Sequence, residues 1–437
     1  MSQFNRRDFL KVAAGASVLV PISACAQTGS RASAGGGKQR VVVIGGGFGG
    51  ATAAKYLKIG APGLDVTLVE RNKTFTSCPL SNEVLSGEVQ LSKLEIGYDG
   101  LAKRGVNLVF DDATAIDADK KTVKLKSGKT LNYDALVLSP GIDFDFAAVE
   151  GHSEALANTV LPHAYKAGPQ TLLLKKQLES MKDGGTFIIA VPPGPFRCPP
   201  GPYERAAQVA NYFKHKGMNT SKVLILDAND SFSKKGLFEQ AWALQYPGMI
   251  EWVPGASGGK VIKVDAKSNT VFTDFDKFTG DVVNIIPPHH AGHIAKNTGL
   301  TNDRGWCTVN MLTMESTVKP DIWVVGDSCV HGELPVYGAP KSAHMANTQA
   351  KVAVAAIIAK LNGLPAPEPY FVNTCYSVTA PGWGFSVVHV YRVVDGKLVY
   401  ATDAGGVSPV DAPAIQRKLE SEYQVGWFRN IMADSFA

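Results

Sequence analysis

Three glycines at a fixed spacing give the sequence its clearest chemical signal. The apolar run 41–44 leads into the pattern Gly-x-Gly-x-x-Gly, and small residues suited to a helix follow. In a strand–turn–helix unit this spacing permits a tight turn, lets the backbone approach a pyrophosphate and places the phosphates at the positive end of the helix. A second apolar run ends in an acid, at the distance expected for a carboxylate that binds an adenosine ribose. We therefore predict a dinucleotide site that includes Gly45, Gly47, Gly50, Glu70 and Arg71.

A second strand-to-helix turn carries a thiol and a carboxylate in place of glycines. The run 184–191 is followed by a proline-filled segment in which Cys198 stands six residues before Glu204. Prolines lack backbone N–H groups, so this turn cannot cradle a pyrophosphate as a glycine loop does. We predict that this half has kept the dinucleotide-binding fold, has lost NAD(P)H and presents both side chains where ligands of open α/β sheets bind. The alternative is a rigid proline loop around a buried structural thiol.

Two further groups of residues could do chemistry, but their contexts favour other roles. Cys307 and Cys329 lie in apolar strand contexts, so we predict that both are core thiols. His289, His290 and His293 follow two prolines. Histidines in such a loop are more often solvated or hydrogen-bonded than metal-bound, so we expect no metal and place this loop near the active site.

The elements that must position these residues form two similar halves and a C-terminal part. We predict an α/β fold with two Rossmann-like dinucleotide-binding domains and a C-terminal α+β interface domain. The first domain is expected over 37–150 and 291–362, the second over 151–290 and the C-terminal domain over 363–437. The expected elements are strands over 66–69, 133–138, 184–191, 223–226 (with Asp227 in the acid position) and 322–327, helices over 203–215 and 342–361, a linker over 364–370, a hairpin over 386–402 and a terminal helix.

The first 36 residues have the features of an export leader. Asn-Arg-Arg-Asp-Phe-Leu-Lys at 5–11 is typical of a twin-arginine signal, and the apolar run 12–20 is too short to span a bilayer. We therefore predict a periplasmic protein. Ala24-Cys25-Ala26 fits an ordinary cleavage site, but the same region also fits a lipoprotein signal, which leaves a lipid anchor at Cys25 as the less favoured alternative.

Composition limits the classes of partner. The chain has 44 basic and 39 acidic residues, and much of this excess lies in the leader, so we expect no nucleic-acid partner. No stretch of the exported part is a transmembrane candidate. Five of the six cysteines lie in that part, where disulfides are plausible, but their spacing does not give the pairing.

Several motifs together resemble one known family. They are the leader, the glycine pattern, TSCPLS around Cys78, RCPPGPYE around Cys198, WVVGDSC around Asp327 and NTCYS around Cys375. In this combination the chain resembles the flavoprotein subunit of flavocytochrome c sulfide dehydrogenase, a glutathione-reductase-like flavoprotein family related to the sulfide:quinone oxidoreductases. The resemblance covers nearly all of the exported part, and RCPPGPYE and TSCPLS are its most specific segments.

The resemblance implies a role for each of these residues. FAD would bind the first domain, with Cys78 joined to it by a thioether; a buried core thiol is the alternative. Cys198 and Cys375 would form a redox-active disulfide above the flavin, a pairing that only the resemblance supplies. Glu204 would handle protons and Asp327 would bind the ribityl chain. The segment Tyr337-Gly338-Ala339-Pro340-Lys341-Ser342 would face the flavin with the N–H groups of a helix start.

The function implied by the resemblance is oxidation of sulfide to sulfur or polysulfide, with electrons passed to a cytochrome c subunit. The sequence contains no Cys-x-x-Cys-His, so a c-type haem would belong to a separate chain. One alternative is a sulfide:quinone oxidoreductase, which needs a membrane-dipping C-terminus; a docking or core role suits that region better, because Arg429 is the only basic residue near its apolar stripe. Another is a non-catalytic flavin-binding partner in a sulfur-oxidation complex. The apolar stripe comprises Trp427, Phe428, Ile431, Met432 and Phe436.

Overall fold

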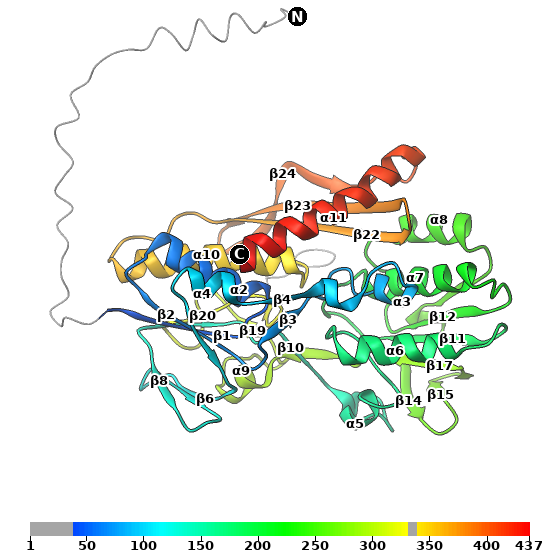
Figure 1. Cartoon of the computed structure of the whole chain (residues 1–437), viewed down its shortest axis with the longest axis horizontal. Coiled ribbons are helices and arrows are strands. Elements are labelled where there is room, and N and C mark those ends of the chain that lie inside the picture. The colour runs from blue at the N-terminus through cyan, green and yellow to red at the C-terminus, as the bar shows by residue number, and fades with distance from the viewer. Residues whose placement is uncertain (1–37, 331–338) are drawn as a thin grey trace, which may run out of the picture. The chain divides into compact units, whose positions relative to one another are not determined.

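The glycine turn lies at the end of the central strand of a five-stranded sheet (Figure 1). The computed structural model describes residues 38–330 and 339–437, and Gln39–Ala437 form one compact unit. The predicted leader, Cys25, Tyr337 and Gly338 lie outside the described residues. The strand order is β20-β9-β1-β2-β5, and every neighbouring pair is parallel. The strands are β1 (Arg40–Ile44), β2 (Asp65–Glu70), β5 (Asn107–Phe110), β9 (Ala135–Leu138) and β20 (Ile322–Val324).

Helices α2 (Phe48–Gly60) and α10 (Ala343–Leu361) pack against each other beside this sheet. The runs Val41–Ile44 and Ala135–Leu138 are buried along their whole length, as expected for parallel strands covered on both faces. Ser342 caps α10, since its hydroxyl accepts a hydrogen bond from the Met345 N–H at 3.1 Å. The strand–glycine turn–helix unit predicted from the sequence is therefore present.

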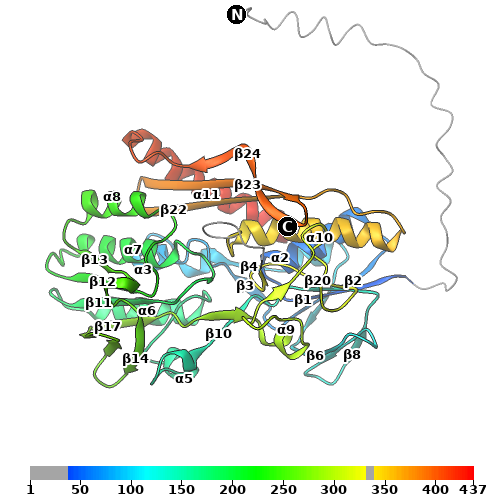
Figure 2. The same ribbon diagram turned by 180° about the vertical axis from the view of Figure 1, so that it is seen from behind.

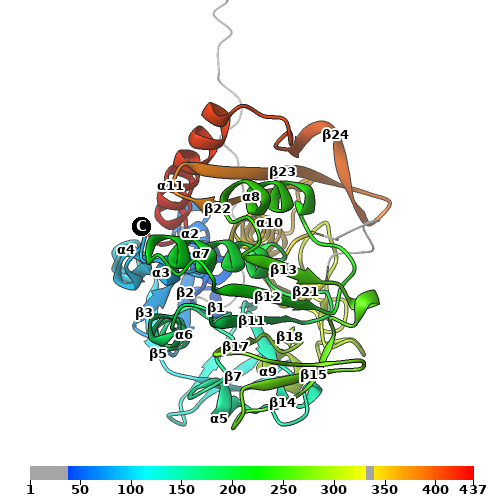
Figure 3. The same cartoon turned by 90° about the vertical axis from the view of Figure 1, so that its right-hand side faces the viewer.

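A second parallel sheet repeats this arrangement, with the strand order β13-β12-β11-β17 (Figure 3). Its strands are β11 (Thr186–Val191), β12 (Lys222–Asp227), β13 (Ile250–Val253) and β17 (Val282–Ile285). The accompanying helices are α6 (Pro169–Ser180), α7 (Gly201–His215) and α8 (Lys235–Gln245). In each sheet one strand, β1 or β11, leads through a turn into a helix, α2 or α7. This arrangement confirms the predicted class of two Rossmann-like domains.

Smaller elements join and edge the two sheets. Strand β10 (Ile142–Phe144) runs between them, as Figure 2 shows from behind, and it pairs antiparallel with β18 (His289–Ala291). The remaining strands are β3 (Thr74–Thr76), β4 (Glu95–Gly97), β6 (Ala113–Asp117), β7 (Thr122–Leu125), β8 (Thr130–Asn132), β14 (Val261–Asp265), β15 (Thr270–Thr273), β16 (Lys277–Thr279), β19 (Cys307–Thr308) and β21 (Cys329–Val330). The short helices are α3 (Glu83–Ser86), α4 (Asp99–Lys103), α5 (Glu154–Ala157) and α9 (His293–Asn297), with 3₁₀ turns at Leu91–Leu94, Phe146–Ala148 and Gly255–Ser257.

The C-terminal part is an antiparallel meander followed by a long helix (Figure 3). It consists of β22 (Tyr370–Ala380), β23 (Trp383–Val394), β24 (Lys397–Val407) and α11 (Ala414–Phe436). Strand β22 contacts α10 of the first half and both α7 and α8 of the second. The predicted hairpin and terminal helix are present. Strand β22 was not predicted: the sequence indicated only a linker up to Tyr370, and no helix or strand was predicted around Cys375.

The apolar stripe on α11 belongs to the core. Ile431, Met432 and Phe436 are buried, and the Phe436 ring stacks on Phe75 with centroids 5.1 Å apart. Of the two roles that the sequence left open for this stripe, the structure therefore selects the core for these three residues. In the part of the chain that the structure describes, no helix is both long and apolar enough to cross a membrane.

Candidate active site

One cavity of about 1520 Å³ gathers the predicted site residues. The glycine turn, the end of β2, the proline-filled loop before α7 and strand β22 all contribute to its wall. The predicted residues that line it are Gly45, Gly47, Glu70, Arg71, Cys78, Cys198, Glu204, Asp327, Lys341 and Cys375. Gly50 lies behind the turn rather than in the wall. The fold thus brings together residues from 45 to 375 that the sequence could only group by motif.

The glycine turn has the shape that a pyrophosphate requires. Gly45 has a φ of +93°, and a Cβ there would lie 2.2 Å from the Ser139 carbonyl oxygen. A Cβ on Gly50 would lie 1.8 Å from the Gly45 carbonyl oxygen, so helix and turn pack without room for a side chain. Gly47 precedes the first residue of α2, whose N-terminus carries partial positive charge. These residues fit the phosphates of a dinucleotide such as FAD.

The acid at the end of β2 is held by the turn itself. The Gly46 N–H donates to Glu70 Oε2 at 2.7 Å, and the Asn72 N–H donates to Glu70 Oε1 at 2.9 Å. This places the carboxylate at the cavity wall beside the glycine turn, where a ribose hydroxyl would bind. Arg71 is exposed and pairs with Asp112 at 3.0 Å, so its guanidinium lies at the rim.

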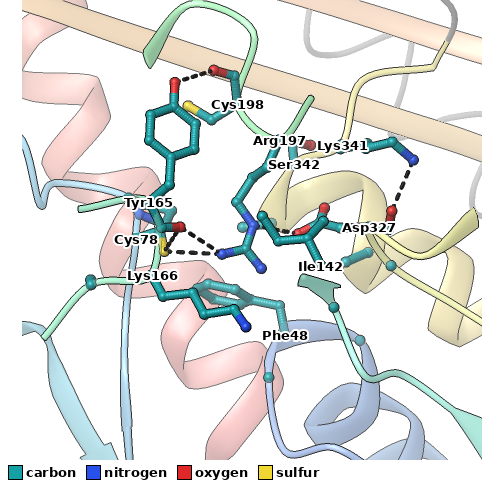
Figure 4. A pocket seen from close by; sticks show the side chains of 18 of the residues that line it. Phe48, Cys78, Ile142, Tyr165, Lys166, Arg197, Cys198, Asp327, Lys341 and Ser342 are labelled. Atoms are coloured by element: carbon teal, nitrogen blue, oxygen red, sulfur yellow. Dashed lines mark hydrogen bonds and ion pairs between the residues drawn. The ribbon is translucent and has the colours of Figure 1, made fainter. Parts of the chain in front are cut away.

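An arginine with no role predicted from the sequence lines the cavity and lies among the other labelled site residues (Figure 4). Arg197 Nε donates to Asp327 Oδ2 at 2.6 Å, and Nη1 lies 2.9 Å from the Tyr165 carbonyl oxygen and 3.5 Å from Cys78 Sγ. Burial alone would lower the pKa of Arg197, but Asp327 and then Cys78 outweigh it and raise that pKa. Arg197 therefore links the predicted flavin-attachment thiol to the predicted ribityl-binding carboxylate. The one feature of the sequence that could have pointed to Arg197 is its position next to Cys198 in RCPPGPYE.

Cys198 occupies a strained turn that the fold holds firmly. Its φ is +51°, its N–H donates to the Lys341 carbonyl at 2.9 Å and its own carbonyl accepts the Gly201 N–H at 2.8 Å. A Cβ on Gly201 would lie 3.1 Å from Cys198 Sγ, so the glycine leaves room for the thiol. Burial raises the pKa of Cys198 well above its usual value, and the neighbouring Cys375 raises it further.

Glu204 lies on the first turn of α7, and its carboxylate accepts one hydrogen bond from β22 and one from Asn82. Its Oε1 accepts the Val378 N–H of β22 at 2.9 Å, and its Oε2 accepts the Asn82 side-chain amide at 3.0 Å. Burial raises the pKa of Glu204, against the opposing effect of these two hydrogen bonds. Cys375, in the middle of β22, is partly exposed and lines the same cavity. Cys198 and Cys375 are both free thiols in this structure.

The start of α10 closes the cavity opposite the proline-filled loop. Pro340, Lys341 and Ser342 line the wall. The Lys341 ammonium donates to the carbonyls of Asp327 at 2.8 Å and Cys329 at 2.5 Å, and burial lowers its pKa to about 8. Figure 4 shows this side chain directed towards the Asp327 backbone. Lys341 thus links the segment before α10 to the segment that contains Asp327 and Cys329.

The proline-filled loop leaves no equivalent cradle in the second half. Asp227, in the acid position at the end of β12, is fully buried and accepts hydrogen bonds from the hydroxyl of Tyr203 at 2.5 Å and the indole N–H of Trp252 at 2.9 Å. The carboxylate that would bind a nicotinamide-cofactor ribose is therefore part of the packing. The Tyr203 ring stacks on Phe232 with centroids 3.6 Å apart, which covers this position further.

The other two groups of candidate residues, the cysteines at 307 and 329 and the histidine loop, are buried or hydrogen-bonded within the fold. Cys307 and Cys329 are fully buried on the paired strands β19 and β21. His289 Nδ1 accepts the Arg197 N–H at 3.0 Å, so the histidine loop contacts the proline-filled loop. Over residues 38–330 and 339–437, no group of three or more His, Cys, Asp or Glu is arranged to hold a metal ion.

Comparison with known proteins identifies the class of protein that this fold and site define. A pyridine nucleotide-disulphide oxidoreductase model matches residues 39–171. The solved sulfide:quinone oxidoreductase of Aquifex aeolicus superposes with a TM-score of 0.71 at 18% identity, over 91% of each chain. The chain is therefore an α/β protein of the glutathione-reductase-like two-domain class.

Two narrower family models match a central and a C-terminal part of the chain. The central model of the sulfide dehydrogenase [flavocytochrome c] flavoprotein chain matches residues 171–287, and the flavin-binding model of flavocytochrome c sulphide dehydrogenase matches 367–436. The flavocytochrome c sulfide dehydrogenase flavoprotein chain of Chlorobaculum thiosulfatiphilum is 58% identical over 37 residues, which are 8% of this chain and 77% of that sequence. The chain belongs to the family of flavocytochrome c sulfide dehydrogenase flavoprotein chains.

More distant relatives are sulfide:quinone oxidoreductases. The mitochondrial enzyme of Mus musculus is 24% identical over 288 residues, covering 64% of this chain and 63% of that protein. The mitochondrial enzyme of Dictyostelium discoideum is 24% identical over 334 residues, covering 72% of this chain and 69% of that protein. The chain thus spans just under two thirds of the mouse relative.

Proposed function

We propose that this chain is the flavoprotein of a periplasmic sulfide dehydrogenase. It would oxidise sulfide at a Cys198–Cys375 bridge beside covalently bound FAD and pass the electrons to a separate cytochrome c subunit. The observation that carries the proposal is the meeting of two thiols and a buried carboxylate in the cavity that contains the glycine turn. The family models support a flavin, and the twin-arginine motif supports export.

The chemistry of the thiol site follows from these residues. HS⁻ attacks one sulfur of the bridge; the bridging S–S bond breaks and a new S–S bond forms, which leaves a persulfide on one cysteine and a thiolate on the other. Each sulfide oxidised to zero-valent sulfur releases one proton and two electrons. Glu204, whose pKa burial raises, lines the same cavity and would take the proton.

The same cavity would hold the cofactor. The glycine turn and Glu70 would bind the dinucleotide, and Cys78 would form the thioether. Asp327 would bind the ribityl chain after its hydrogen bond with Arg197 is released. When bound, FAD supplies an acceptor that takes two electrons and gives them up singly. Arg197 Nη1 lies 3.5 Å from Cys78 Sγ, so the guanidinium is directly beside the sulfur that would form the thioether.

Substitution of the two cysteines tests the proposal. We expect Cys198→Ser and Cys375→Ser each to lower the rate of sulfide-dependent flavin reduction by at least about a thousand-fold, and the double variant to lose no more, because the pair acts as a unit. Reduction by dithionite, which needs no bridge, should persist in all three. Near-normal sulfide oxidation by folded Cys198→Ser protein would contradict the proposal and would leave a non-catalytic flavin-binding role.

A second candidate function is sulfide:quinone oxidoreduction. It is favoured by the mouse and Dictyostelium relatives and by exposed apolar side chains on α11, namely Ile415, Leu419 and Tyr423. The two functions differ in the acceptor. We expect sulfide-reduced protein to reduce a soluble cytochrome c faster than a short-chain quinone, and the opposite order would establish the second candidate.

A further inference from the structure

A lysine from the second Rossmann-like half lies against the cysteine of β22. Lys234 directly precedes α8, in the loop that follows β12, and has a left-handed backbone with a φ of +63°. Its ammonium nitrogen lies 3.7 Å from Cys375 Sγ and 3.3 Å from the Cys375 carbonyl oxygen. The Ser377 hydroxyl is the third partner, at 2.8 Å. A strained backbone at this point directs a charged side chain to a sulfur 141 residues further along the chain.

The contacts of this ammonium group are unusual for a buried charge. Only 9% of Lys234 is exposed, and its hydrogen-bond partners are a carbonyl, a hydroxyl and a thiol, all of which are neutral. A buried ammonium is costly unless an anion offsets the lost hydration. Of a carbonyl, a hydroxyl and a thiol, the thiol is the kind of group that can become an anion.

The other titratable groups around Cys375 supply no competing positive charge. Burial raises the pKa of Cys198, and it also raises that of Glu204 even though Lys234 acts against it. His344, whose Nδ1 accepts the Thr374 N–H at 3.0 Å, has its pKa lowered by burial, and the same holds for His389 on β23. Burial raises the pKa of Tyr376, which keeps its hydroxyl neutral. Among these neighbours of Cys375, the cation is Lys234.

We propose that Lys234 is the cationic partner of Cys375, and that its ammonium group stabilises an anionic sulfur at that position. When the bridge opens, the S–S bond breaks and one cysteine keeps the electron pair, so a negative charge must be accommodated at this site. The Lys234 ammonium stabilises this negative charge at Cys375. The charge is carried either by the Cys375 thiolate or by the terminal sulfur of a persulfide on Cys375. The catalytic meaning of this pairing rests on the proposed sulfide oxidation, but the pairing itself does not.

The pairing is testable on the reduced holoprotein without sulfide. The bridge is opened with dithiothreitol, the protein is pulse-alkylated with iodoacetamide between about pH 5 and 10, and the peptides with Cys375 and Cys198 are quantified by mass spectrometry. We expect Lys234→Gln to raise the pH midpoint for Cys375 by about one unit or more, since an opposite charge within 4–6 Å commonly shifts a pKa by 1–3 units. Lys234→Arg should restore most of the shift.

Lys235→Gln is the matched control. Lys235 is the next residue, but its ammonium lies over the Trp252 ring and pairs with Glu239 at 3.7 Å, so its loss should leave the Cys375 midpoint unchanged. Wild-type protein gives a second test that needs no variant: Cys375 should be alkylated at a lower pH than Cys198. An unchanged Cys375 midpoint in folded Lys234→Gln protein, or a Cys375 midpoint at or above that of Cys198, overturns the proposal.

The same proteins separate this inference from the proposed function. If the Cys375 midpoint depends on Lys234 but the wild-type protein does not oxidise sulfide, the proposed function fails and the Lys234–Cys375 pairing stands. If sulfide is oxidised but the midpoint does not depend on Lys234, the pairing fails and the function stands.

Discussion

The two Rossmann-like halves share a topology and differ in the turn that follows the central strand. After β1 the turn is made of glycines, has no space for a side chain at Gly45 or Gly50 and precedes a helix N-terminus. After β11 the turn is filled with prolines and presents Cys198 and Glu204. The acids at the ends of the next strands differ in the same way, since Glu70 lines the cavity and Asp227 is buried beneath Tyr203. One fold thus provides a phosphate cradle in one half and, through different turn residues joined by Cys375 of β22, a thiol site in the other.

The strongest way to break this comparison is to place the same methyl group in both turns. In Gly50→Ala the new Cβ would lie 1.8 Å from the Gly45 carbonyl oxygen, so we expect loss of bound flavin and a destabilisation of roughly 3 kcal/mol or more. In Gly194→Ala, in the turn after β11, the Cβ meets nothing nearer than Asn229 Oδ1 at 3.8 Å, and we expect a change below about 0.5 kcal/mol. Flavin content and thermal unfolding of both variants measure this. Equal sensitivity of the two turns would show that the halves do not differ as described.

A smaller effect is expected when only the link to the flavin is removed. Cys78→Ala should still bind FAD through the glycine turn, but acid denaturation should release the flavin, whereas wild-type protein should retain it on the polypeptide. Cys375→Ala removes another thiol of the same cavity and should keep the flavin attached. The mass of the denatured chain is the measurement. Complete release of flavin from wild-type protein would end the thioether assignment.

A buried acid beside Glu204 should give a modest dependence of stability on pH. Burial first, and then the charge of Glu204, raises the pKa of Glu83 from 4.5 to about 8. Below about 4.5 Glu83 is protonated in the folded and the unfolded chain; between about 4.5 and 8 only the unfolded chain loses the proton. The stabilising contribution is therefore complete at low pH and is lost as the pH rises through about 8.

Glu83→Gln should remove this loss. We expect the variant to be more stable than wild-type protein by roughly 1–3 kcal/mol above pH 8, and the difference to shrink towards pH 5. Glu422→Gln, on the exposed side of α11, is the control and should follow wild-type protein at every pH. Urea unfolding across the pH range is the measurement. A wild-type stability that rises between pH 5 and 8 to the same extent as in Glu83→Gln would rule out a protonated Glu83.

The smallest expected effect is none at all. NADH and NADPH should neither bind nor bleach the flavin, because the prolines after β11 deplete the N–H donors that a pyrophosphate needs and Asp227 is already engaged. Rapid-mixing absorbance with sulfide as the positive control measures this. Fast flavin reduction by NADH alone would mean that the second half still works as a nucleotide site.

The sequence predicted the parts of the site that local patterns encode. The glycine turn, Glu70 and the loop with Cys198 follow apolar runs of clear period, and the structure has strands and helices at those places. It did not predict β22, because Asn373 and Ser377 are polar yet buried, which hides the alternation of a strand. Cys375 was therefore known only from a resemblance to a family.

Lys234 and Arg197 were missed for a different reason. Both lie in loops, where the direction of a side chain depends on backbone angles that no periodicity reports. Lys234 reaches Cys375 from a backbone with a φ of +63°, and Arg197 reaches Asp327 across 130 residues of sequence. Contacts of this kind arise from tertiary packing and become visible only when the fold is known.

The end of α11 has a consequence for the order in which the protein matures. Phe436 packs on Phe48, the first residue of α2, and the Ser435 and Thr52 hydroxyls are 3.0 Å apart. The helix that follows the glycine turn therefore gains its last packing partners only after almost the whole of this sequence has left the ribosome. A chain stalled short of residue 435 would lack these contacts to α2, so any cofactor loading that needs the finished cradle would follow synthesis of α11.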